Sequence, residues 1–74
     1  MEYKTKDLGE AAALITEGIK LVGLNWEENI CWFEFSGADI KKISDMYWSG
    51  DLLVPARVYA GNLRSLKDRL FAQK

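Results

Sequence analysis

The sequence contains no histidine, one cysteine and one proline among its 74 residues. A single cysteine, Cys31, cannot form an internal disulfide. A zinc site would need one thiolate and several carboxylates, a combination that zinc proteins rarely use. Without histidine, neither Cys31 nor any serine has the usual general base of a nucleophilic enzyme. We therefore expect no catalytic residues, no metal and no cofactor, and we interpret Cys31 as a buried core residue.

Several longer patterns are absent as well. No apolar run approaches the roughly 20 residues that span a bilayer. Residues 1–18 lack the basic start and apolar block of a secretory signal. No glycine-rich phosphate loop is present, and a lone cysteine within a β-type run is typical of a reducing compartment. These absences predict a cytoplasmic protein with no membrane partner and no evident small-molecule substrate.

The sequence is rich in apolar and aromatic residues. They make up 49% of the chain, with three tryptophans, three tyrosines and three phenylalanines. This composition excludes disorder, and the length predicts a single domain over residues 1–74. The net charge is only −1, yet residues 1–37 carry three basic and seven acidic groups, whereas residues 38–74 carry seven and four. The two halves can attract each other, or the second half can contact a polyanion.

The first part of the chain predicts a strand followed by a helix. β-forming residues alternate over residues 2–5. Asp7 and Glu10 have the spacing of a capping box, which starts a helix, and Gly18 is a natural stop. The apolar residues between them share one helical face: Leu8, Ala11, Ala12 and Ile15.

The middle of the chain predicts a β-hairpin with strands over residues 19–26 and 30–36. An even loop centred on Glu28-Asn29 keeps the apolar side chains together on one face. In this register the facing pairs are Trp26 with Cys31, Leu24 with Phe33, and Val22 with Phe35. The opposite face then carries Leu21, Gly23, Asn25, Trp32 and Glu34.

The last part of the chain predicts two more helices. Ser36 and Asp39 form a second capping-box-like pair, before a helix that runs to about Trp48 and ends at Gly50. Residues 52–54 predict a short strand or an extended linker, and the final helix runs over residues 56–73. The fold class is therefore α+β, in the order β-α-β-β-α-(β)-α, with a small, mostly antiparallel sheet and a central hairpin packed against helices.

This pattern resembles a family of small uncharacterised phage and bacterial domains of unknown function. Its opening, Y-x-T-x-D-L-x-E-A-A, corresponds to residues 3–12. A glycine-led hydrophobic strand over residues 18–23, an aromatic strand over residues 32–35 and the tail over residues 63–71 are similar too. The resemblance implies a phage-related bacterial origin, and it implies no activity or site.

Two surfaces are candidates for interactions. Trp32 lies on the second face of the predicted hairpin with Leu21 and Asn25, and an exposed tryptophan on a sheet needs a cover. The cover can be the third helix or the first strand, a second copy of the chain, or a base or another protein. The second surface is the basic flank of the last helix, where the possible phosphate contacts are Arg57, Arg64 and Lys67.

The absence of catalytic chemistry and the aromatic excess lead to one principal hypothesis. The chain is predicted to be a non-enzymatic interaction module of phage or mobile-element origin that self-associates or binds another protein. The alternative is a small nucleic-acid-binding protein that uses the basic flank of the last helix.

Overall fold

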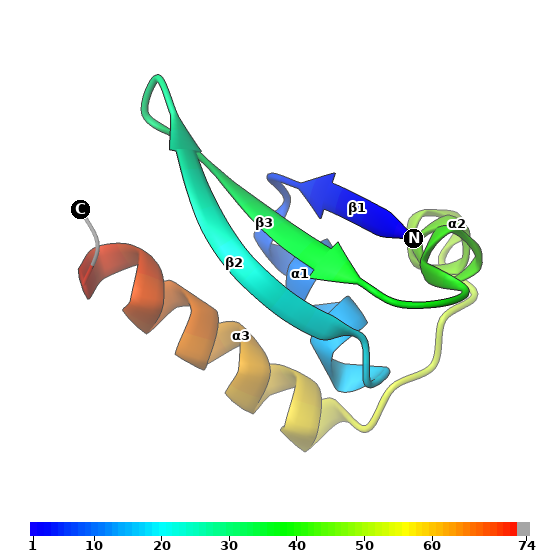
Figure 1. Cartoon of the computed structure of the whole chain (residues 1–74). Coiled ribbons are helices and arrows are strands. Elements are labelled where there is room, and N and C mark those ends of the chain that lie inside the picture. The colour runs from blue at the N-terminus through cyan, green and yellow to red at the C-terminus, as the bar shows by residue number, and fades with distance from the viewer. Residues whose placement is uncertain (73–74) are drawn as a thin grey trace.

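The structure is a computed structural model that describes residues 1–72. The α+β class is confirmed (Figure 1), with the elements β1 (Glu2–Thr5), α1 (Leu8–Thr16), β2 (Lys20–Glu27), β3 (Ile30–Ser36), α2 (Ile40–Ser49) and α3 (Ala56–Ala72). Residues 52–54 form an extended linker, so the optional strand predicted there is absent from the described chain. Residue 73, the predicted end of the last helix, lies outside the described residues.

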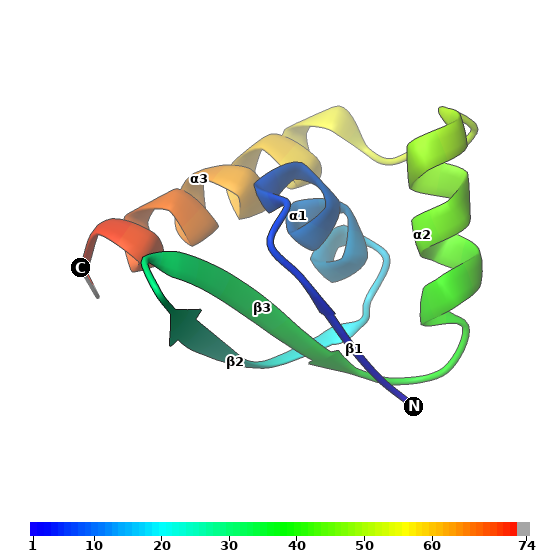
Figure 2. The ribbon, with the colours of Figure 1, turned by 90° about the horizontal axis from the view of Figure 1, so that it is seen from above.

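The three strands form one antiparallel sheet in the order β1-β3-β2. Since β3 runs antiparallel to both neighbours, β1 and β2 are parallel to each other, which is the split β-α-β arrangement. Helices α1 and α3 cover one face of the sheet, and α2 stands at one end (Figure 2). We call the face without a helix the outer face.

The hairpin has the predicted two-residue turn. Glu28 and Asn29 have φ angles of 50° and 74°, as a type I′ turn requires. The predicted pairs of Trp26 with Cys31 and Leu24 with Phe33 are confirmed. The core therefore receives the side chains that the apolar pattern assigned to it near the turn.

A β-bulge makes the third predicted pair wrong. The register shifts between Leu21 and Gly23, so Leu21 is the residue opposite Phe35. The extra residue, Val22, has a 53% exposed side chain, while Leu21 packs against the core. A bulge places two residues of one strand against one of its partner and thereby exchanges the faces of the residues beyond it.

Helix α1 lies at the centre of the core. Three consecutive alanines and Leu14 are at most 1% exposed, and their small side chains let α1 pack closely between its neighbours. The remaining fully buried side chains come from the sheet and the other two helices: Phe33, Phe35, Ile40 and Leu66.

The two predicted capping boxes have different outcomes. The Asp7 side chain accepts a hydrogen bond from the Glu10 backbone N–H at 2.7 Å, so Asp7 caps α1 as expected. At α2, Asp39 has a φ of 63° and its side chain makes no capping hydrogen bond, so the predicted pair with Ser36 is wrong. A capping side chain normally requires an extended backbone, and the tight turn before Ile40 puts Asp39 in the left-handed region. The predicted stop at Gly50 is confirmed, with a φ of 84°.

A candidate interaction groove

An apolar groove opens at the end of the molecule where the hairpin turns. It consists of two adjoining hollows of about 430 and 320 Å³ that share Leu8, Trp26 and Leu70. We call these together the end groove. The larger hollow is completed by Lys67 and Phe71, and the smaller one by Lys6, Asn29, Ile30, Cys31 and Phe33.

The groove exists because the hairpin is longer than its neighbour β1. Strand β1 ends at Thr5, which lies opposite Phe33, so the pairs nearer the turn have no third strand beside them. Figure 1 shows the hairpin extending past β1, with the last turns of α3 near its tip. Helix α1 begins only at Leu8 and forms one end of the groove. The apolar face of the hairpin tip is therefore covered in part by α3 and left open in part.

Trp26 carries the one unusual atom of the groove. Its indole Nε1 is buried and has no hydrogen-bond partner among the described residues. A buried donor without an acceptor costs about 1–3 kcal/mol. An acceptor that enters the groove from another molecule and reaches this N–H removes that cost.

The charged residues that line the end groove are both basic, Lys6 and Lys67. Cys31 also lines it and is 8% exposed, so the prediction of a buried core cysteine is confirmed. Burial raises the pKa of the Cys31 thiol, and the positive charge of Arg69 opposes that rise. The thiol is therefore a small apolar group at neutral pH, and the groove has the character of a binding surface.

The outer face holds two of the three predicted interaction residues. Trp32 is half-buried, and the Lys4 amine lies 5.0 Å from the centroid of its ring. Of the covers predicted for Trp32, the first strand thus supplies part. Asn25 pairs with Trp32 and is exposed, whereas the bulge removes Leu21 from this face.

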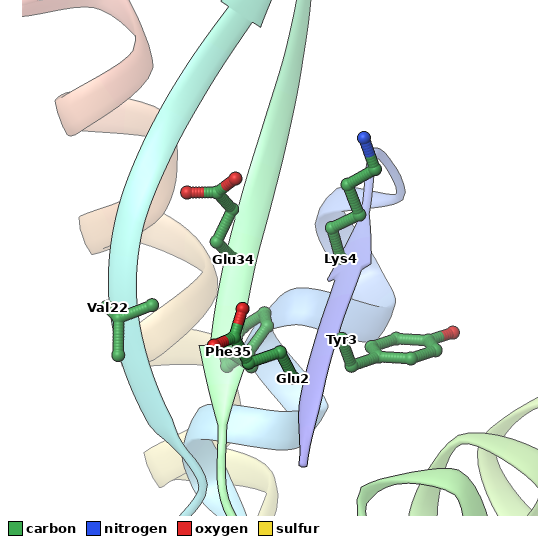
Figure 3. A pocket seen from close by; sticks show the side chains of 6 residues that line it. All are labelled: Glu2, Tyr3, Lys4, Val22, Glu34 and Phe35. Atoms are coloured by element: carbon green, nitrogen blue, oxygen red, sulfur yellow. The ribbon is translucent and has the colours of Figure 1, made fainter.

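A shallow hollow of about 290 Å³ also lies on the sheet. Figure 3 shows its lining side chains on all three strands: Glu2, Tyr3, Lys4, Val22, Glu34 and Phe35. Neither Trp32 nor Asn25 lines it. Its charged groups have both signs, as is usual for the solvated face of an antiparallel sheet.

The predicted phosphate contacts are spread along α3. Arg57, Arg64 and Lys67 are all exposed. Arg57 lies ten residues before Lys67, which is about 15 Å along the helix axis. Of the three, only Lys67 lines the end groove.

A buried polar cluster at the start of α1 has no counterpart in the sequence analysis. The Glu10 carboxyl group is 1% exposed. It accepts hydrogen bonds from the Tyr3 hydroxyl at 2.8 Å, the Thr5 hydroxyl at 2.7 Å and the Ser44 hydroxyl. We call these four residues the Glu10 cluster, and it ties β1 and α2 to α1. Its members are up to 34 residues from Glu10 in the sequence, so the spacing of Glu10 from Asp7 could indicate only a cap.

Tyr47 lies beside this cluster. Its hydroxyl is 3.5 Å from the Asp7 carboxyl oxygen. Burial, together with the negative charge of Asp7, raises the pKa of Tyr47 to about 12. Glu10 lines none of the three hollows, so this polar region holds the fold together and offers no cleft for a substrate.

Comparison with family models, with curated proteins and with solved structures found no match to this chain. The resemblance to phage and bacterial domains therefore depends on the quoted residues alone and stays a prediction. Within residues 1–72, no group of three acidic, cysteine or histidine side chains could hold a metal ion. No helix of the same range is long and apolar enough to cross a membrane.

Proposed function

We propose that this chain is a non-enzymatic interaction module that binds another protein, and that the end groove receives an apolar side chain of that partner. The observation that carries the proposal is the buried indole N–H of Trp26, without an acceptor, in an apolar groove open to solvent. Binding sites of this kind combine apolar walls with a few polar groups that fix orientation. A partner's side chain would fill the groove, and its backbone would supply the acceptor.

Two exposed apolar residues at the groove support this assignment. Phe71 is 72% exposed and Ile30 is 41% exposed, and both line the hollows. Aromatic and large aliphatic side chains at the edge of a pocket are typical of protein-binding surfaces. The outer face is the weaker candidate, because Lys4 already contacts Trp32 there.

The test is a selection of displayed peptides against the purified chain. Ile30→Ser and Phe71→Ser reduce the apolar surface of the groove. Val22→Ser and Val58→Ser are matched controls, since both valines are 53% exposed and neither lines the end groove. We expect the selected peptides to lose about tenfold or more in affinity, or ~1.4 kcal/mol, for the groove variants only. Thermal unfolding of each variant verifies that it folds.

Two outcomes would contradict the proposal. One is a selection that yields no peptide, or peptides that bind the groove variants as well as the natural chain. The other is binding of single-stranded DNA that falls steeply with salt and is lost in Arg57→Gln and Arg64→Gln. That result would favour the nucleic-acid alternative, whose predicted contacts include these two arginines.

A further inference from the structure

The end groove has a charge sign opposite to that of the whole chain. The net charge is −1, yet Lys6 and Lys67 are the charged residues of the groove. Three acidic residues adjoin lining residues in the sequence, but none of them lines either hollow: Glu27, Glu28 and Asp68. The groove therefore presents positive charge beside apolar walls.

These two lysines are not neutralised within the described chain. The ion pair found in residues 1–72 joins Lys41 and Asp45 on α2, and it involves neither groove lysine. Arg69 adds positive charge near the groove, since it acts electrostatically on Cys31. The donor of Trp26 faces the same need for an acceptor. The polar groups that lack a partner here are thus cations and a hydrogen-bond donor.

We infer that the occupant of the end groove is an acidic peptide segment of a partner protein. A central apolar side chain fills the hollow, an oxygen of the segment accepts the Trp26 indole hydrogen bond, and flanking carboxylates lie against Lys6 and Lys67. This inference rests on the proposed function and adds the chemistry of the partner. Charge complementarity favours this occupant because it adds attraction at the edge and excludes basic segments.

The experiment uses three labelled peptides that share one central phenylalanine. Its neighbours are glutamates in the first peptide, glutamines in the second and lysines in the third. We expect the glutamate peptide to bind about tenfold more tightly than the glutamine peptide, and more weakly as salt rises. Fluorescence anisotropy measures the affinities. In a ¹⁵N–¹H spectrum, the indole signal of Trp26 should move when the glutamate peptide binds.

A charge-reversed chain provides the matched test. Lys6→Glu with Lys67→Glu should make the lysine peptide the preferred ligand. Lys20→Glu with Lys42→Glu changes the net charge equally at exposed positions outside the groove, and it should keep the natural preference for glutamate. The comparison separates local complementarity from a general effect of net charge.

Three results would overturn the inference. Equal affinity for all three peptides, with loss of binding in the Phe71→Ser variant, would remove the acidic partner and leave the proposed function standing. No binding by any peptide, together with a failed selection, would remove both. Sedimentation that finds a dimer of the natural chain but a monomer of Ile30→Ser would identify a second copy as the occupant.

Discussion

The Glu10 cluster and the end groove lie on the same helical face of the sheet and treat buried polar atoms in opposite ways. The Glu10 carboxyl group accepts three hydroxyl hydrogen bonds from two other elements of the chain. The Trp26 indole N–H finds no acceptor in the described chain. A satisfied buried group fixes one arrangement of the fold, whereas an unsatisfied one is costly until something binds. The first region therefore serves stability, and the second has the properties of a site.

Removal of Glu10 should produce the largest effect. Glu10→Ala takes away the acceptor shared by the hydroxyls of Tyr3, Thr5 and Ser44. We expect the free energy of unfolding to fall by about 3 kcal/mol, measured by urea denaturation. Glu17→Ala is the control, because Glu17 is exposed at the other end of the same helix. A loss below about 1 kcal/mol would mean that the cluster does not hold these elements together.

High pH should weaken the same region of the molecule. The pKa of Tyr47 is raised to about 12 from an ordinary value of 10.0, so the folded state resists formation of the phenolate. The stabilisation is complete below pH 10 and is lost as the pH rises from about 10 to about 12. Urea midpoints across this range should therefore fall for the natural chain, and by less for Tyr47→Phe. An identical fall in both proteins would exclude Tyr47 as a cause.

Trp26→Phe should have the smallest effect on stability and sharpens the contrast most. Phenylalanine keeps a ring in the groove and removes the unpaired N–H, whose burial costs about 1–3 kcal/mol. This gain offsets the weaker packing of the smaller ring, so we expect a change in unfolding free energy below about 1 kcal/mol. Trp48→Phe is the control, since Trp48 is 61% exposed. A loss above about 3 kcal/mol at Trp26 would show that its indole already has a structural role.

The sequence predicted the hairpin well near its turn and poorly at its far end. Glu28-Asn29 and the apolar pairs beside it leave one register that buries the aromatic side chains. At the bulge, the adjacent residues Leu21 and Val22 are both apolar, so either could face the core. The pattern therefore could not show which of the two faces outward, and the predicted outer face wrongly included Leu21.

The end groove could not be predicted because its walls come from separate parts of the chain. Leu8, Trp26 and Leu70 belong to α1, β2 and α3, and each fits an ordinary apolar pattern in its own element. The groove depends on how far the hairpin extends past β1, which no local spacing records. The Glu10 cluster was missed for the same reason, since its hydrogen bonds are between distant residues.

The bulge in β2 also bears on how the chain behaves at high concentration. Strand β2 is an edge of the sheet, and a regular edge offers a row of free backbone groups to which a strand of another molecule can add. The extra residue at Val22 interrupts that row within an eight-residue strand. The opposite edge, β1, is only four residues long. The fold thus protects itself from aggregation through its sheet edges and leaves association to surfaces with side-chain specificity.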